Sequence, residues 1–179
     1  MITGPSGVGK GTLIQGLLER CPGFELSVSA TTRAPRPGEQ EGRAYHFLSL
    51  PVFEERAARG EFVEHAVYAG NRYGTLRSEL ERPARAIVLE IDLQGARQIR
   101  ESLPQAVQVF IAPPSIEHLE ERLEQRGSDS PEQIARRLEV AITELAAQKE
   151  FSRVVVNDDL DRALEELADL AATMYAPDD

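Results

Sequence analysis

The sequence predicts an α/β fold in which helices flank a parallel β-sheet. Short runs rich in β-branched residues alternate with segments of helical periodicity along most of the chain, which is the pattern of a parallel sheet with crossover helices. A glycine-rich stretch at residues 4–10 leads into a helical pattern, as at the first strand-to-helix turn of such folds. The length of 179 residues fits a single domain with inserted lobes rather than two full domains.

Four segments are expected as sheet strands because each is short, apolar and bounded by polar or turn residues. They are Glu25–Ser29, Ala86–Ile91, Ala106–Ala112 and Val154–Asn157. Five segments with apolar residues every three or four positions are expected as helices. They are Gly11–Arg20, Leu93–Ser102, Ile116–Arg126, Pro131–Lys149 and Leu160–Tyr175. Three of these helices follow typical N-cap residues, Ser115, Ser130 and Asp159, and Ser130 with Gln133 forms a capping-box pattern.

The regular alternation is interrupted between residues 34 and 83, where short pieces of period two surround a short helix expected at Phe53–Arg59. We expect this segment to form a small mixed α/β lobe inserted into the core, which then comprises residues 1–33 and 84–179. Two helical segments around residues 122–145 are expected to form a mobile helical lid.

Charge and composition exclude several classes of protein. The formal net charge of −10 argues against a general nucleic-acid-binding protein and against binding to an anionic membrane surface. No apolar run is long enough to span a bilayer, and the single cysteine, Cys21, cannot form an internal disulfide. We therefore expect a cytoplasmic protein whose partners are small molecules. Residues 1–50 hold five basic and four acidic residues, so an anion site is expected early in the chain.

Only three residues, Met1, Ile2 and Thr3, precede the glycine-rich stretch. The first strand of a parallel sheet usually has five or six residues. We expect either further residues upstream of Met1 or a fold that tolerates a shortened strand.

The glycine-rich stretch is the strongest motif in the chain and predicts a nucleotide phosphate loop, which by itself fits a GTPase, a motor ATPase or a small-molecule kinase. Glycines allow backbone angles that turn successive N–H groups inward around an anion, and the following helix adds its positive N-terminal end. A lysine at the end of the stretch supplies a compact charge to the phosphates. The expected phosphate-binding residues are Gly4, Pro5, Ser6, Gly7, Val8, Gly9, Lys10, Gly11 and Thr12, with Lys10 also catalytic. A plain turn followed by a helix cap is the alternative.

A Mg²⁺ ion is expected with the nucleotide phosphates, but the sequence departs from the usual pattern for holding it. The position after Lys10, which usually carries Ser or Thr, is Gly11, and Thr12 follows one residue later. Asp92 ends an apolar run and is the candidate metal contact, through water. Its alternative role is the N-cap of the helix at Leu93–Ser102, and both roles are compatible.

Residues 29–45 indicate a second phosphate site. Arg33 and Arg36 lie three residues apart in a proline-containing loop, and Tyr45 follows. A guanidinium group can bind two phosphate oxygens at once, so two arginines with a phenol hydroxyl suit a phosphate monoester. The alternative is a basic loop whose arginines are only solvated.

Glu64, Tyr73 and Thr75 suggest which base this second nucleotide carries. A carboxylate such as that of Glu64 can accept from N1–H and the exocyclic amine of guanine, and a hydroxyl can donate to O6. Adenine offers neither pattern and would leave buried polar groups unpaired.

Four arginines surround the turn at residues 127–130 and could approach the phosphates when the lid closes. Arg126 and Arg137 are the expected catalytic residues, whereas Arg122 and Arg136 are expected as solvated residues paired with neighbouring glutamates. The three histidines lack metal-ligand spacing and are expected in ordinary packing or surface roles.

Several motifs, in order along the chain, resemble guanylate kinase, a P-loop nucleoside monophosphate kinase. These motifs are Gly4–Lys10, Ser29–Arg36, Gly42–Phe47, Tyr73–Thr75, Asp92–Gly95, Ile111–Ser115 and Val156–Asp158. The resemblance implies a P-loop NTPase-type core, a GMP-binding lobe, and phosphoryl transfer from ATP to GMP or dGMP in purine nucleotide metabolism. It matches Ser29, Arg33, Arg36 and Tyr45 to the GMP phosphate and Glu64 and Thr75 to guanine. Arg33 is expected to act in catalysis as well, and Tyr73 and Asp92 complete the expected substrate contacts. Three features depart from the family pattern: Gly11 at the position that usually carries a hydroxyl, Glu90 where aspartate is common, and the short segment before the glycine-rich stretch.

Two other functions also fit the sequence. One is a guanylate-kinase-like module that binds phosphopeptides without catalysis, although the intact loop with Lys10 argues against it. The other is a P-loop kinase acting on a different phosphorylated acceptor, which would not need Glu64 and Thr75 together.

Overall fold

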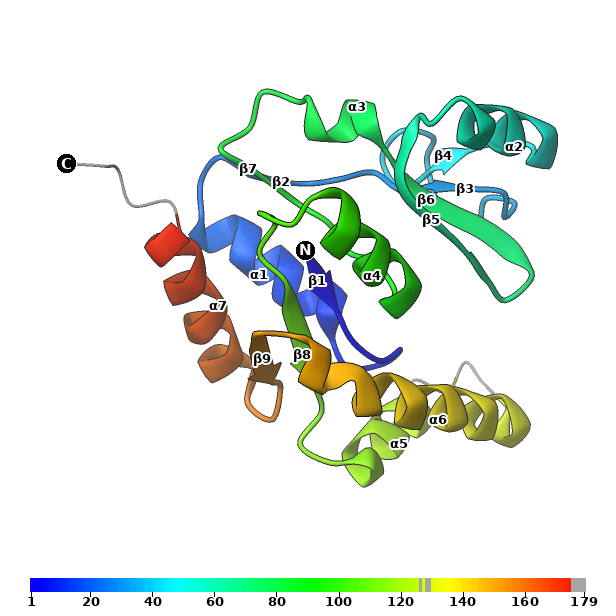
Figure 1. Cartoon of the computed structure of the whole chain (residues 1–179). Coiled ribbons are helices and arrows are strands. Elements are labelled where there is room, and N and C mark those ends of the chain that lie inside the picture. The colour runs from blue at the N-terminus through cyan, green and yellow to red at the C-terminus, as the bar shows by residue number, and fades with distance from the viewer. Residues whose placement is uncertain (126, 128–129, 175–179) are drawn as a thin grey trace. The chain divides into compact units, whose positions relative to one another are not determined.

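The computed structural model describes residues 1–125, 127 and 130–174, and the chain divides into two compact units. Unit 1 comprises Met1–Gly23 and Val107–Asp179, and unit 2 comprises Phe24–Ala106. Figure 1 shows that both units contain helices and strands, as an α/β fold requires. Each unit is described by itself.

Unit 1 contains a parallel three-stranded sheet in the order β1-β8-β9. Its strands are β1 (Ile2–Thr3), β8 (Val109–Ala112) and β9 (Arg153–Val156). All four residues of the central strand β8 are buried, as expected for a strand covered on both faces. The first strand has two residues. The expected strand at Ala106–Ala112 begins later, because the Ala106 N–H donates to the Leu103 carbonyl in a turn (2.9 Å) and leaves the ladder.

Four α-helices accompany this sheet in the described part of unit 1. They are α1 (Lys10–Arg20), α5 (Ile116–Gln125), α6 (Pro131–Ala146) and α7 (Leu160–Met174). The predicted caps are confirmed: the Ser115 hydroxyl accepts from His118 N–H (3.3 Å), Ser130 forms the capping box with Gln133, and Asp159 accepts from Arg162 N–H (2.9 Å). The expected helix to Lys149 instead changes at Ala147 into the 3₁₀ turn η1 (Ala147–Glu150). The expected last residues of α5 and α7, Arg126 and Tyr175, lie outside the described residues.

The core of unit 1 forms between these helices and β8. Its largest fully buried side chains include Leu13 and Ile14 of α1, Phe110 and Ile111 of β8, and Leu119 and Leu123 of α5. This packing places the start of α1 and the middle of α5 on the same core as the central strand, so the glycine-rich loop before α1 has a rigid support.

Unit 2 contains two sheets. In the first, β2 (Phe24–Leu26) pairs in parallel with β7 (Ala86–Val88). In the second, of order β4-β3-β6-β5, β3 pairs in parallel with β4, while β6 is antiparallel to both β3 and β5. Its strands are β3 (Ala30–Thr31), β4 (His46–Phe47), β5 (Phe62–Tyr68) and β6 (Asn71–Leu76). A mixed α/β lobe was expected at residues 34–83, and the four-stranded sheet begins before that segment, at Ala30.

The helices of unit 2 are α2, α3 and α4. Their bounds are Leu50–Ala58, Arg77–Leu80 and Leu93–Ser102. Helix α4 has the predicted bounds. The short helix expected at Phe53–Arg59 begins three residues earlier, because Ser49 precedes it and Pro51 in the first turn needs no N–H partner there.

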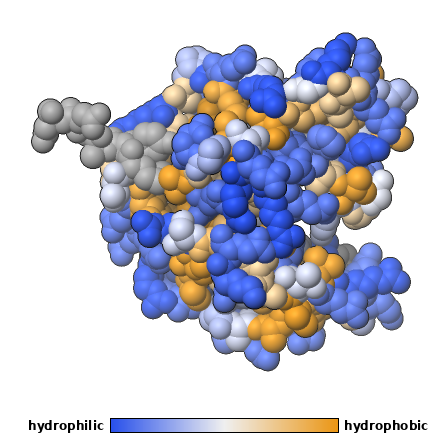
Figure 2. Space-filling view, viewed as in Figure 1, coloured by the Kyte–Doolittle hydropathy of each residue, from blue (hydrophilic) through white to orange (hydrophobic). Residues whose placement is uncertain are grey.

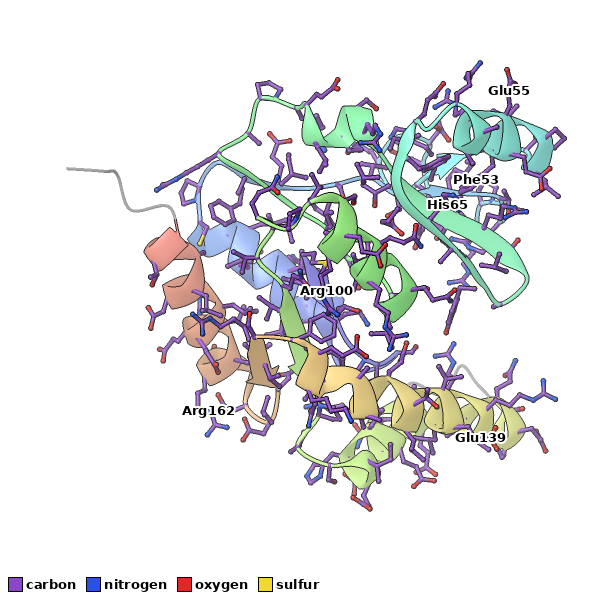
Figure 3. The ribbon with its side chains drawn as sticks, in the orientation of Figure 1. Phe53, Glu55, His65, Arg100, Glu139 and Arg162 are labelled. Atoms are coloured by element: carbon purple, nitrogen blue, oxygen red, sulfur yellow. The ribbon has the colours of Figure 1, made fainter. Side chains whose placement is uncertain are left out.

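A small apolar cluster joins α2 to the four-stranded sheet. Phe53 and Phe62 stack with ring centroids 4.4 Å apart, and Ala30 and Leu76 complete the cluster. His65, labelled with Phe53 in Figure 3, packs edge-on against Phe53 (6.1 Å), so this histidine has the packing role expected of it. The cluster fixes the register of β5 and β6, which carry the predicted base-recognition residues.

On the face shown in Figure 2, hydrophobic patches are separated by hydrophilic side chains. In the part of the chain that the structure describes, no helix is long and apolar enough to cross a membrane.

Candidate active site

The predicted phosphate loop connects β1 to α1 and has the backbone that such a loop needs. Gly4 and Gly9 have φ angles of 144° and 97°, which L-residues with side chains rarely adopt. A Cβ at Gly4 would lie 2.2 Å from the Ile111 carbonyl oxygen, and one at Gly9 would lie 2.6 Å from Asn157 Nδ2. Both positions therefore require glycine, because of conformation and because of space.

Lys10 is the first residue of α1, and its side chain folds back over the loop. Its Nζ donates to the carbonyl oxygens of Gly4 (2.7 Å) and Pro5 (3.0 Å). The ammonium group is thus placed beside the N-terminal end of a helix, where an anion is also favoured by the helix dipole. Gly11 and Thr12 lie exposed in the first turn.

Arg122 corrects one expectation from the sequence. It was expected to be a solvated residue of α5, but it binds the phosphate loop instead. Its Nη1 donates to the Val8 carbonyl (3.1 Å) and its Nη2 to the Asn157 carbonyl (2.8 Å). The Val8 carbonyl also accepts from Asn157 Nδ2 (2.8 Å), and Asn157 is buried. The reason is the packing of α5: Leu119 and Leu123 are buried against the space beside Gly7, which turns Arg122 toward the loop.

The remaining lid arginines lie on or near α6. Arg136 is exposed, as expected, and Arg137 is half-buried. Arg126 lies outside the described residues.

In unit 2, Arg33 lies in an ordered cluster of charged and aromatic groups. Its Nη1 and Nη2 donate to the two carboxylate oxygens of Glu39 at 3.0 and 2.8 Å, and its guanidinium lies 5.2 Å from the Tyr45 ring centroid. The hydrogen bonding that Arg33 donates to Glu39 is the main cause that raises the pKa of Arg33. Tyr45 and Tyr73 pack edge to face (6.1 Å), so the structure brings Arg33, Tyr45 and Tyr73 together.

The other predicted phosphate residues flank this cluster. The Arg36 N–H donates to Glu39 (2.7 Å), while the Arg36 side chain is exposed. The Ser29 carbonyl accepts from the His46 N–H (2.9 Å), which connects the start of β3 to β4. Burial raises the pKa of Tyr45, so its hydroxyl stays protonated and able to donate.

Glu64 and Thr75 face each other across the β5-β6 pair. Both are buried, with 5% and 0% of their surface exposed, and the Thr75 hydroxyl donates to Glu64 Oε1 (2.7 Å). Burial raises the pKa of Glu64 from 4.5 to about 7, and the charge of Asp92 adds to this effect. A buried ionised carboxylate destabilises the folded protein unless a ligand or a partner residue donates hydrogen bonds to it.

Asp92 is the N-cap of α4. Its Oδ1 accepts from the Gly95 N–H (2.8 Å), so the alternative role considered for this residue is present in the structure. Among the described residues, no group of three or more His, Cys, Asp or Glu side chains is arranged to hold a metal ion.

Three residues of these clusters were not identified from the sequence as functional. Glu39, Asn157 and Arg122 each act through contacts that depend on the fold. The only available signals were the occurrence of Asn157 in a motif and the position of Arg122 beside the apolar Leu119 and Leu123.

Comparison with known proteins agrees with this geometry. The family model described as guanylate kinase matches residues 1–173. A guanylate kinase of Trichormus variabilis is 55% identical over 168 residues, which cover 92% of this chain and 84% of that protein. A guanylate kinase of Parasynechococcus marenigrum is 54% identical over 173 residues, 95% of each chain. The crystal structure of guanylate kinase from Anaplasma phagocytophilum is 32% identical, with a TM-score of 0.78, and the match covers 98% of this chain and 86% of that one. The chain therefore belongs to the guanylate kinase family.

Proposed function

We propose that this protein transfers a phosphoryl group from ATP to GMP, forming ADP and GDP, and that it also accepts dGMP. The observation that carries the choice of GMP is the buried pair formed by Glu64 and Thr75. An ionised Glu64 accepts from N1–H and the 2-amino group of guanine, and the Thr75 hydroxyl turns its single proton from Glu64 Oε1 to O6 when the base binds. AMP has neither N1–H nor a 2-amino group, so it would leave these acceptor positions of the carboxylate unpaired, and the site rejects it.

The acceptor phosphate is assigned to the cluster around Arg33. Arg33, Arg36 and the hydroxyls of Tyr45 and Tyr73 supply donors to its oxygens, with Ser29 at the start of β3. Glu39 already holds Arg33 through both oxygens, which keeps the guanidinium in one orientation before substrate binds. This order lowers the entropy that binding would otherwise cost.

The donor ATP is assigned to the loop from Gly4 to Thr12. Its backbone N–H groups and the α1 N-terminus cradle the phosphates, and Lys10 exchanges its carbonyl partners for phosphate oxygens as charge develops. Arg137, together with Arg126, neutralises charge on the transferred group. No general base is required, because the acceptor is a phosphate monoester.

Mg²⁺ fits this site only as an ion carried mainly by the nucleotide. Gly11 offers no hydroxyl, and the described residues hold no ready cluster of ligands. Mg²⁺ usually keeps several waters and needs few protein ligands. A single contact from Asp92 through water is therefore enough protein contact for the ion. When bound, the ion neutralises phosphate charge during transfer. We further propose that the GMP lobe spans residues 34–83 and that the lid spans about residues 122–145.

The test is a coupled assay of ADP formation with ATP, Mg²⁺ and a panel of GMP, dGMP, AMP, UMP and CMP. We expect turnover with GMP and dGMP and at least a hundredfold lower kcat/KM with the other three. Absence of GMP turnover in folded protein would overturn the proposal, and binding of a phosphopeptide in its place would favour a non-catalytic module.

A further inference from the structure

Gly95, in the first turn of α4, lies directly against the carboxylate of Glu64. A Cβ at position 95 would lie 2.4 Å from Glu64 Oε2 and 3.0 Å from Cδ. Contacts this short do not occur between real atoms, so the carboxylate occupies space that exists only because residue 95 has no side chain. The helical backbone of α4 itself suits alanine, a better helix former than glycine.

Helix α4 cannot move away to make that space, because its side chains bind the edge of β5. The side-chain amide of Gln98 accepts from the His65 N–H (3.1 Å) and donates to the His65 carbonyl (2.8 Å). His65, labelled on β5 in Figure 3, directly follows Glu64 in the chain. One turn earlier and later, Gln94 and Ser102 reach the carbonyls of Val67 and Val63, each at 3.5 Å. Residues spaced by four along α4 thus hold the helix along the strand edge that β6 leaves open.

The other side of the carboxylate is fixed as well. Thr75, which is fully buried, donates to Oε1 from β6. Glu64 is therefore confined between a hydroxyl on one side and the bare backbone of Gly95 on the other. Any side chain at position 95 meets the flexible end of Glu64 first, so the carboxylate is the group that must shift.

We propose that Gly95 is a positioning residue for guanine recognition, and that Gln98 supports it by holding α4 against β5. The absence of a side chain at position 95 sets where Glu64 presents its oxygens to the base. This inference rests on the proposed function, since it concerns the same base site.

The test is Gly95→Ala, assayed for GMP and ATP separately. We expect the KM for GMP to rise at least tenfold and the KM for ATP to stay within twofold. The melting temperature should be unchanged or higher, because alanine favours the helix and the strain is relieved at a side-chain end. Glu101→Ala, an exposed change on the same helix, is the control and should leave both KM values unchanged. An unchanged KM for GMP in Gly95→Ala would overturn the inference.

A double-mutant cycle with Glu64→Asp separates positioning from general damage. The aspartate carboxylate is withdrawn by one methylene, so it no longer meets a Cβ at position 95. We expect Gly95→Ala to raise the KM for GMP much less in the Glu64→Asp background than in the wild type. Equal effects in both backgrounds would contradict the inference, even if the single variant lost stability.

Failure of the inference is distinguishable from failure of the proposed function. A wild-type protein without GMP turnover overturns both. A wild-type protein that turns over GMP, with a Gly95→Ala variant of the same GMP KM, overturns only the role of Gly95.

Discussion

Replacing Glu64 with glutamine should make the protein more stable and less able to recognise GMP. The buried carboxylate is ionised at pH 8 at a cost, because burial raises its pKa from 4.5 to about 7. A folded-state pKa above the unfolded value means that the folded protein binds the proton more tightly. The contribution of Glu64 to stability is therefore greatest below pH 4.5 and is lost as the pH rises from 4.5 to 7. At pH 8 the cost is about 3 kcal/mol, and at pH 5 it is under about 1 kcal/mol.

Glutamine has the same shape and carries no charge, so Glu64→Gln removes this cost. For a chain of this size, about 3 kcal/mol corresponds to a rise in melting temperature of about 6–12 °C at pH 8. The gain should shrink to about 1–3 °C at pH 5. The amide also presents a donor to a guanine donor, so the variant loses one charged hydrogen bond. That loss costs about 2–3 kcal/mol, which raises the KM for GMP by a factor of about 30–150.

The assay is thermal unfolding of wild type and Glu64→Gln at pH 5 and pH 8, followed by KM values for GMP and ATP at pH 8. The KM for ATP should stay within twofold. A melting temperature that falls at pH 8, or a gain that is equal at both pH values, would refute the assignment of the cost to a buried ionised carboxylate. A KM for ATP that rises as much as the KM for GMP would refute the assignment of Glu64 to guanine.

Three further outcomes are expected. Lys10→Ala should lower kcat by about 10²–10³-fold while a fluorescent ATP analogue still binds, because the lysine acts on charge that develops during transfer; a change confined to ATP affinity would argue against this role. Arg122→Ala should raise the KM for ATP about tenfold without changing the KM for GMP, because it removes the hydrogen bonds to the carbonyls of Val8, in the loop, and Asn157 beside it. An equal KM for ATP in variant and wild type would show that these contacts do not order the loop. In the wild type, the KM for GMP should rise about tenfold as the pH falls from 8 to 6, because Glu64 takes up its proton. In Glu64→Gln the KM for GMP should change less over this pH range, because only the phosphate of GMP itself then titrates.

The features that were predictable from the sequence are those in which local chemistry and final structure agree. The glycine loop was recognisable because its backbone conformation demands glycine wherever it occurs, and Gly4 and Gly9 adopt it. The N-caps at Ser115, Ser130 and Asp159 depend on atoms within four residues. Glu64 and Thr75 were expected as guanine contacts from the chemistry of the base and from the family resemblance, and strand pairing places the two residues opposite each other.

The features that were missed depend on contacts between distant segments. Arg122 lies in a helix rich in glutamate, so an ordinary surface pairing was expected, but the packing of α5 directs it to Val8, 114 residues away. Gly95 looks like any glycine early in a helix until Glu64 from another element is placed against it. Strand ends were also misjudged, because turns such as that between Leu103 and Ala106 remove backbone groups from the sheet without an obvious signal in composition.

The most direct test of base selection is the ratio of kcat/KM for GMP to that for inosine monophosphate, which keeps N1–H and O6 but lacks the 2-amino group. If Glu64 accepts from both N1–H and the amine, the wild-type protein should prefer GMP by at least about tenfold. In Glu64→Gln this ratio should fall toward one. A wild-type ratio near one, or a ratio that Glu64→Gln leaves unchanged, would contradict the assignment of guanine recognition to Glu64.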